Sequence, residues 1–214
     1  MPDVAQSLYQ KYRPTTFAEL IGNDRIVTEL KGILARRDAG KPHAHALLFH
    51  GPTGCGKTTL AYVFAREIGC DFEFDLEELP CGIEGGVDAM RHISRDNLYV
   101  PMGNTVKVVL LDECHLLTKR AQGGLLSVLE RERPRPVYFL LTTTEPATLL
   151  PTLVGRCSTF EVEMLDLKDT GRLLRRVAKK EGRSEVVTAE LIDSIYAATN
   201  GHPRNILGKL ETKL

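Results

Sequence analysis

A glycine-rich stretch in the first third of the chain carries the residue types that hold a polyphosphate. Gly51 to Thr58 reads as a glycine, four residues, a glycine, a lysine and a threonine. In such a loop the backbone N–H groups and the positive end of the next helix dipole surround the phosphates. We expect Lys57 to reach the β- and γ-phosphates and the Thr58 hydroxyl to ligate Mg²⁺. The predicted phosphate-binding residues are Gly51, Pro52, Thr53, Gly54, Cys55, Gly56, Lys57 and Thr58.

The segments on either side of this loop are the ones that such a site requires. Residues 46–49 form a short apolar run that predicts a buried strand, and residues 59–68 have the pattern of a helix. A chance glycine-rich turn is the alternative interpretation. A strand that enters the loop and a helix that leaves it favour a site for a nucleoside triphosphate.

Two consecutive acids end a second apolar run. Residues 106–111 predict a buried parallel strand whose carboxyl end carries Asp112 and Glu113. Downstream of a phosphate-binding loop, we expect Asp112 to hold Mg²⁺ and Glu113 to accept a proton from an attacking water. An ordinary strand end that runs into an exposed acidic turn is the alternative. A third apolar run, residues 137–141, ends in three threonines at 142–144, whose hydroxyls would face the same crevice.

Strands and helices alternate along most of the chain, which predicts an α/β fold with a parallel sheet flanked by helices. The other elements that the pattern predicts here are helices over 24–37, 87–93 and 118–131, strands over 72–76 and 158–162, and loops over 8–16, 79–86, 97–105 and 131–136. From Leu165 onward the pattern is helical alone. We therefore expect a nucleotide-binding domain over residues 1–164 and a small helical lid over residues 165–214.

A pair of glycines interrupts one of the predicted helices. Gly123 and Gly124 lie inside the helix over 118–131, where each costs roughly 1 kcal/mol relative to alanine. We expect either that a backbone packs closely at this point or that the helix begins later in the chain.

The composition excludes several classes of protein. Lysine plus arginine and aspartate plus glutamate both number 28, so any contact with nucleic acid must be local. The five cysteines have no C-x-x-C spacing, and an odd number without a secretory signal indicates reduced thiols in a cytosol. Cys55 and Cys114 flank the predicted phosphate site, where they would be either oxidation-sensitive or simply small semi-buried residues. No apolar run approaches the roughly 20 residues that span a membrane.

Together with several further stretches, these motifs resemble the AAA+ ATPase subunits of sliding-clamp loaders. The resemblance is strongest to the bacterial DNA polymerase III gamma/tau subunit and to phage and archaeal small subunits, and it covers nearly the whole chain in the order of the family. The Tyr-Arg-Pro opening, the Thr-Thr-Glu-Pro stretch and the Arg-Cys pair are much more specific than the phosphate-binding loop. The matching stretches are Tyr9 to Gly22, Gly51 to Thr59, Asp112 to His115, Leu125 to Glu130, Thr143 to Pro146, Arg156-Cys157 and Gly201 to Arg204.

The resemblance implies which residues of this chain contact ATP. Arg13, Pro14 and Ile21 would lie near the adenine, and Thr59 would complete the phosphate-binding stretch. Arg204 would be sensor 2, which reaches the γ-phosphate from the lid and couples the lid angle to the nucleotide.

The resemblance also implies roles in hydrolysis. Thr144, or alternatively Thr143, would be sensor 1, which orients the attacking water. Arg156 would be an arginine finger that acts in trans on ATP bound to a neighbouring subunit. A cation supplied in this way stabilises charge on the transferred phosphoryl group and makes hydrolysis depend on assembly.

The partners that the resemblance implies are other clamp-loader subunits in a ring or spiral, a sliding clamp and primer–template DNA. The cofactors would be ATP and Mg²⁺, and the location the cytoplasm of a bacterial or phage-infected cell, with no membrane contact. Arg91, Lys119 and Arg120 would meet the DNA backbone, although a solvated charged face is the alternative for each. The basic run over 172–180 would be a solvated or inter-subunit face.

The chain departs from the family pattern at four points. Gly155 replaces the serine of the Ser-Arg-Cys motif, and Gly123-Gly124 replaces an Asn-Ala pair. The four-cysteine zinc module is missing after Cys70, so we expect no zinc. The helical collar domain would begin where this sequence stops, at Leu214, which suggests either a truncated chain or a compact viral relative.

These features favour an ATP-dependent motor subunit that loads a sliding clamp on primer–template DNA. Two alternatives stay open at this point. The chain would otherwise be an assembly subunit that binds nucleotide but hydrolyses little, or another AAA+ DNA remodeller, such as a helicase loader or branch-migration motor.

Overall fold

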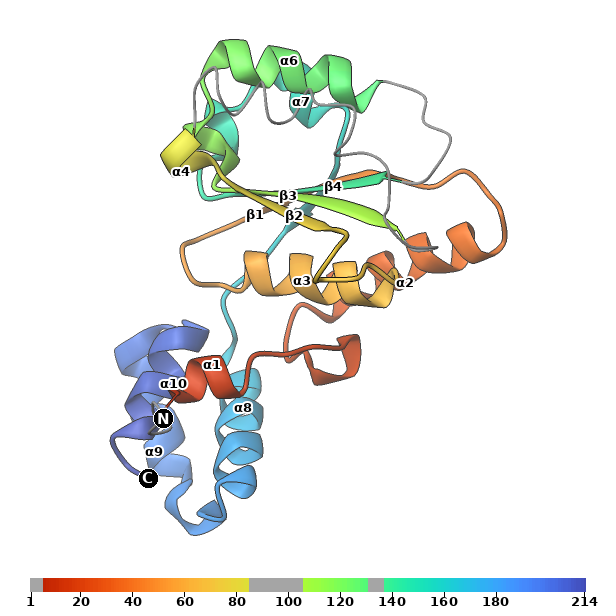
Figure 1. Cartoon of the computed structure of the whole chain (residues 1–214). Helices are drawn as coiled ribbons and strands as arrows, with labels where there is room; N and C mark the ends of the chain where they lie inside the picture. The colour runs from red at the N-terminus through yellow and green to blue at the C-terminus, as the bar shows by residue number, and fades with distance from the viewer. Residues whose placement is uncertain (1–5, 85–105, 131–136) are drawn as a thin grey trace, which may run out of the picture.

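The fold is built on a parallel sheet. The computed structural model describes residues 6–84, 106–130 and 137–214 (Figure 1). The described residues form one sheet of five parallel strands in the order β2-β3-β4-β1-β5. These strands are β1 (Ala46–His50), β2 (Leu76–Pro80), β3 (Lys107–Asp112), β4 (Val137–Thr143) and β5 (Ser158–Glu161). The chain crosses from β1 to the far edge and returns through β3 and β4, so a crevice opens at the carboxyl ends of the central strands, where ligands bind in such sheets.

Helices cover both faces of the sheet. In Figure 1, α2 (Asp24–Asp38) and α3 (Lys57–Glu67) lie on one side, and α4 (Cys81–Glu84), α6 (Lys119–Leu129) and α7 (Pro151–Val154) lie on the other. Side chains alternate along each strand. In β1, Leu47 and Phe49 therefore pack under α3, while Leu48 packs towards α6. Because both of their faces are buried, the three central strands β1, β3 and β4 are mostly apolar, as the sequence predicts.

The C-terminal fifth of the chain is helical and has its own apolar cluster. It consists of α8 (Leu167–Lys180), α9 (Ala189–Thr199) and α10 (Pro203–Glu211). The cluster also contains Leu8 from α1 (Leu8–Lys11), a helix that lies beside α10 in Figure 1. The boundary after residue 164 stays a prediction, but the start of the chain shares its core with the lid helices.

Two expectations about local structure are wrong. Residues 72–75 form a turn before β2 rather than a strand, because the Asp75 N–H donates to the Asp71 carbonyl at 2.7 Å and closes the chain there. Phe74 is consequently 53% exposed. The N-terminal segment begins with α1 rather than with a loop, because burial of Leu8 against the lid stabilises this turn of helix.

The glycine pair does not interrupt its helix. α6 begins at Lys119, where the Thr118 hydroxyl accepts from the Ala121 N–H at 3.2 Å and caps the helix. A Cβ atom at Gly123 would meet nothing within 4 Å, so close backbone packing does not explain that glycine. Instead, Leu125 and Val128 pack against the sheet, and their burial stabilises the helix. Nothing in the structure explains Gly123.

Several predictions concern other short segments. The expected loop over 79–86 is partly regular, because β2 continues to Pro80 and α4 follows. The expected helix over 87–93 and the loops over 97–105 and 131–136 lie entirely outside the described residues. Within the described ranges, no helix is both long and apolar enough to cross a membrane. The described residues also contain the 3-10 turns η1 (Phe17–Glu19), η3 (Cys114–Leu116), η4 (Pro146–Thr148) and η5 (Ser184–Val186).

Candidate nucleotide-binding site

The phosphate-binding loop joins β1 to α3 through glycines with left-handed backbone conformations. Gly54 has φ of 74° and Gly56 has φ of 109°, which other residues rarely adopt. A Cβ atom on Gly51 would come within 2.2 Å of the Val162 carbonyl oxygen in the segment that leads to the lid. Both backbone conformation and space therefore require glycines in this loop.

Lys57 lies inside this loop, at the start of α3. Only 4% of the residue is exposed, and its ammonium donates to the carbonyl oxygens of Gly51 at 3.0 Å and Pro52 at 2.9 Å. A buried ammonium requires such partners because its desolvation is costly. The loop thus holds one positive charge beside the backbone N–H groups at the start of α3, which suits a phosphate.

Asp112 ends β3 next to the loop, as predicted. One of its carboxylate oxygens accepts from the Thr58 hydroxyl at 3.0 Å and from the Thr142 hydroxyl at 2.5 Å. Thr142 points to the α3 side because it shares a face of β4 with Tyr138 and Leu140. Sequence reasoning placed the threonines in this crevice but did not single out Thr142, although side-chain alternation along β4 is a signal that identifies it.

Glu113 follows in a left-handed conformation, with φ of 53°. Its N–H donates to the Thr142 hydroxyl at 3.1 Å, and its carboxylate accepts from the Thr144 hydroxyl at 3.4 Å. The same carboxylate lies 3.3 Å from Nδ1 of His115. These contacts turn the Glu113 side chain away from β3 and hold it at the edge of the crevice, where a base for an attacking water is needed.

The two candidates for sensor 1 make different contacts in the structure. Thr144 contacts the Glu113 carboxylate, whereas the Thr143 hydroxyl lies 3.2 Å from Nδ1 of His115 and accepts from the Glu145 N–H at 3.0 Å. Thr143 therefore supports the loop after β4, while Thr144 lies beside the expected base. Sequence reasoning did not assign a role to His115, which links Glu113 to Thr143.

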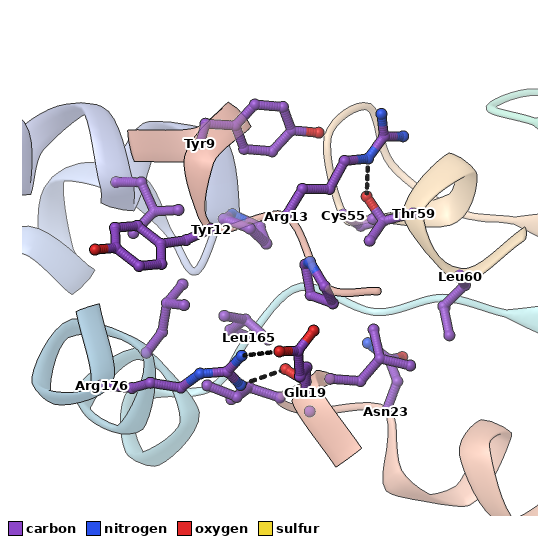
Figure 2. Close-up of a pocket in the computed structure, with 18 of the residues that line it drawn as sticks. Tyr9, Tyr12, Arg13, Glu19, Asn23, Cys55, Thr59, Leu60, Leu165 and Arg176 are labelled. Carbon is purple, nitrogen blue, oxygen red and sulfur yellow. Dashed lines mark hydrogen bonds and ion pairs between the residues drawn. The ribbon is translucent and has the colours of Figure 1, made fainter. Parts of the chain in front are cut away.

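A pocket opens between the loop, the N-terminal segment and the lid (Figure 2). Arg13, Pro14 and Ile21, the residues expected near adenine, all line it, together with Gly54 to Gly56 and Thr59. The Arg13 guanidinium donates to the Thr59 hydroxyl at 3.3 Å and stacks on the Tyr62 ring at 4.4 Å. The lid contributes Leu165, Leu173, Val177, Pro203 and Leu207 to the same pocket. An apolar pocket at the end of the phosphate-binding loop fits a nucleoside base.

One residue of the basic run in the lid does not belong to a solvated or inter-subunit face. The Arg176 guanidinium lies at the rim of this pocket, donates to the Glu19 carbonyl and is 4.0 Å from the Glu19 carboxylate (Figure 2). Pairing with Glu19 leaves 27% of the Arg176 side chain exposed. By contrast, Arg172 is exposed and forms an ion pair with Asp169 at 2.8 Å.

Two predicted arginines lie at the periphery of the site. Arg204, at the second position of α10, is exposed, and its guanidinium lies 4.8 Å from the centre of the Tyr9 ring. Arg156 follows α7 and forms an ion pair with Glu130, at the end of α6, in which both side chains are about half exposed. Arg204 thus lies beside Tyr9, a residue that lines the pocket, and Arg156 lies beside Glu130 on the α6 side of the sheet.

The candidate DNA contacts lie at the start of α6. Lys119 and Arg120 are exposed there, and the Lys119 ammonium donates to the Thr148 carbonyl. Arg91 lies outside the described residues. The two described cations therefore share one surface, and their contact with DNA stays a prediction.

Cys55 and Cys114, the two cysteines near the site, are buried. Burial raises the pKa of Cys55 and of Cys114, and raises the pKa of Cys157 to about 12. Because the thiolate is the species that reacts with oxidants, a raised pKa makes these thiols inert at neutral pH. The structure favours the interpretation of Cys55 and Cys114 as small buried residues.

The donor set also suits a magnesium ion. The Thr58 hydroxyl and the Asp112 carboxylate already lie 3.0 Å apart, beside the buried Lys57. Hard oxygen ligands of this kind, one or two from protein and the rest from phosphate and water, are the ones Mg²⁺ prefers. The residues present therefore fit a magnesium nucleotide.

Comparisons with known proteins agree with this geometry. The sequence profile described as "ATPase family associated with various cellular activities (AAA)" matches residues 47–165, and the "Rad17 P-loop domain" profile matches residues 2–79. The chain is 32% identical to DNA polymerase III subunit gamma/tau of Mycobacterium tuberculosis over 97% of its length, and it spans 39% of that relative. It is 35% identical to DNA polymerase III subunit tau of Escherichia coli over 82% of its length, which is 30% of that relative. The resemblance to the gamma/tau subunit is confirmed.

The fold is shared with a solved motor protein. The Thermotoga maritima RuvB Holliday junction branch migration motor superimposes with a TM-score of 0.74 at 23% identity, covering 94% of this chain and 64% of that chain. This likeness confirms the predicted α/β architecture of a parallel sheet flanked by helices, followed by a helical region.

Proposed function

Because this chain belongs to the AAA family of ATPases, we propose that it is an ATP-hydrolysing motor subunit of a sliding-clamp loader. The observation that carries the proposal is the contact network at the carboxyl ends of β3 and β4. In it Thr58 and Thr142 hold Asp112 while Thr144 holds Glu113. Similarity to the gamma/tau subunits supports clamp loading in particular.

In this proposal, different residues of one site bind the phosphates, the adenine and Mg²⁺ and activate the attacking water. Lys57 and the loop N–H groups bind the β- and γ-phosphates, and the apolar pocket beside Arg13 receives the adenine. Thr58 and Asp112 hold Mg²⁺, which when bound neutralises phosphate charge. Glu113 accepts the proton of the attacking water, and its contact with Thr144 orients it for that task. Arg204, which belongs to the lid, contacts the γ-phosphate.

The last cation comes from a neighbouring subunit. Arg156 lies on the α6 side of the sheet, paired with Glu130, and both side chains are about half exposed. A guanidinium at such a surface is accessible to ATP bound by another chain, where it stabilises the transition-state charge. Exchange of Glu130 for a phosphate partner would then accompany assembly of the ring.

Clamp and DNA would act on this composite site. Primer–template DNA would meet Lys119 and Arg120 at the start of α6 through backbone phosphates, without reading bases. A clamp held open by the ATP-bound assembly would be released after hydrolysis. Other subunits of the loader, a sliding clamp and primed DNA are the partners of this proposal.

The proposal is tested by phosphate release from ATP, measured for the chain alone, with partner subunits, with a clamp, and with clamp and primed DNA together. We expect a low rate for the isolated chain and a rise of at least tenfold in the full mixture. Arg156→Ala should abolish the rise. A rate that primed DNA and clamp leave unchanged in the assembled complex would contradict clamp loading. Stimulation by branched or unprimed DNA instead would indicate another DNA remodeller.

A further inference from the structure

The guanidinium of Arg204 rests on an aromatic ring. Its central carbon lies 4.8 Å from the centre of the Tyr9 ring, and the described parts of the chain show no ion pair to it. A guanidinium that stacks on the face of a ring keeps the N–H donors along its edge free. Tyr9 therefore restricts the orientation of Arg204 without occupying the donors that a phosphate would need.

The start of α10 is seated on the phosphate-binding loop. The imidazole of His202, the N-cap residue of α10, lies so close to Gly54 that a Cβ there would come within 2.1 Å of the ring. Nδ1 of His202 accepts from the Asn205 N–H at 3.4 Å, which fixes the ring. Arg204 is two residues from this contact, so Tyr9 orients a cation on the helix whose first residues contact the phosphate-binding loop.

Tyr9 is attached to the lid as well as to the pocket. Leu8, its neighbour, is buried in the lid cluster, and the Leu8 N–H donates to the Glu211 carboxylate at 3.1 Å. The Tyr9 side chain also lines the nucleotide pocket opposite Thr59 and Cys55 (Figure 2). Tyr9 and Arg204 thus belong to one unit, and their relative orientation is set before a nucleotide binds.

We propose that Tyr9 is a positioning residue that orients Arg204 towards the γ-phosphate of bound ATP. This inference rests on the proposed function, because it deepens the role of Arg204 in that site. A residue that acts only through Arg204 must affect ATP and not ADP, since ADP has no γ-phosphate. The effect should depend on the electron density of the ring rather than on its hydroxyl.

The test is a fluorescence titration of the whole chain with labelled ATP and ADP. Tyr9→Leu should weaken ATP binding about three- to tenfold and leave ADP binding within twofold, whereas Tyr9→Phe should match the wild type for both. Arg204→Ala combined with Tyr9→Leu should be no weaker than Arg204→Ala alone. Lys11→Ala, which removes the ion pair between the same segment and Glu181, should leave the ATP-to-ADP affinity ratio unchanged.

The opposite results are equally specific. Equal loss of ATP and ADP affinity in Tyr9→Leu, or additive losses with Arg204→Ala, would show that Tyr9 merely supports the fold. If Tyr9→Leu does not fold, Tyr9→pentafluorophenylalanine keeps the ring shape and removes its attraction for cations. Unchanged ATP affinity in that variant would overturn the inference. Failure of the proposed function is separate, because it would appear as ATP turnover that clamp and primed DNA leave unchanged in the assembled complex.

Discussion

The two halves of the candidate site are held by different kinds of contact. Lys57 and Asp112 lie in or beside the core, and each makes two hydrogen bonds within the chain. Arg156 and Arg204 lie at the surface, one paired with Glu130 and the other stacked on Tyr9. Folding of this chain therefore sets the first half, while the positions of the two arginines depend on contacts that a phosphate can replace.

The physical difference is desolvation. Buried polar groups must have partners, because each one left unpaired costs about 1–3 kcal/mol. Exposed ion pairs contribute about 0–1 kcal/mol, since water solvates either partner after separation. A motor that hydrolyses ATP only when assembled needs this combination of a prepared phosphate site and cations that are easily redirected.

The largest expected effect on ATP turnover concerns Arg156, in the exposed half of the site. Arg156→Ala should lower ATP turnover of the assembled complex by about 10³-fold, because an arginine finger stabilises the transition state by that order. Phosphate release measures the rate. Mixing Arg156→Ala chains with Lys57→Ala chains should restore activity, since intact finger and intact loop then meet at one interface. A mixture as inactive as either variant alone would place Arg156 outside a shared site.

The buried half is tested next by Glu113→Gln. Turnover should fall about 100-fold or more, because the amide cannot accept the proton of water. ATP affinity, measured by titration, should stay within threefold, since Lys57 and the loop are untouched. Turnover equal to that of the wild type would exclude Glu113 as the base.

Thr142→Val tests the preparation of the buried half. It removes a hydrogen bond to Asp112 and leaves the Glu113 N–H without its hydroxyl acceptor. We expect a loss of about 1–2 kcal/mol in the free energy of unfolding, measured with urea, and a three- to tenfold lower turnover. Thr159→Val on β5, where the residue is exposed, is the matched control. An equal loss in both variants would argue against the network.

Glu130→Gln should release Arg156 with a smaller effect. The ion pair is half exposed, so its removal should leave the urea midpoint unchanged and lower the ATP concentration for half-maximal turnover of the complex up to about fivefold. Weaker turnover in this variant would show instead that Glu130 positions Arg156 for its task.

The smallest effect concerns the pH dependence of stability. It arises from Glu19 in the N-terminal segment, which contacts Arg176 of the lid. Hydrogen bonds from the Thr15 N–H and hydroxyl, and then the charge of Arg176, lower the pKa of Glu19. A lowered pKa in the folded state means that this stabilisation is present above the ordinary pKa, near 4.5, and is lost as pH falls below it. Thermal melting between pH 6 and 3 should therefore show a shallower decline for Glu19→Gln than for the wild type. Parallel declines would contradict this contribution.

Local patterns predicted the parts of the structure that depend on neighbours in sequence. The apolar runs before Gly51 and before Asp112 are buried strands, as predicted. The alternating pattern over residues 72–75 wrongly predicted a strand, because alternation alone cannot show that a hydrogen bond between Asp75 and Asp71 closes a turn.

Sequence by itself thus determined the family, the sheet with its helices and the glycine-rich loop between β1 and α3, because glycine conformation, strand burial and helix capping act over a few residues. Only the tertiary structure decided that Thr142 holds Asp112, that Thr144 rather than Thr143 contacts Glu113, and that Tyr9 carries Arg204. Those contacts join residues far apart in the chain, and their choice depends on which face of a strand or helix each side chain occupies. Burial of several elements at once sets that orientation, and no local spacing encodes it.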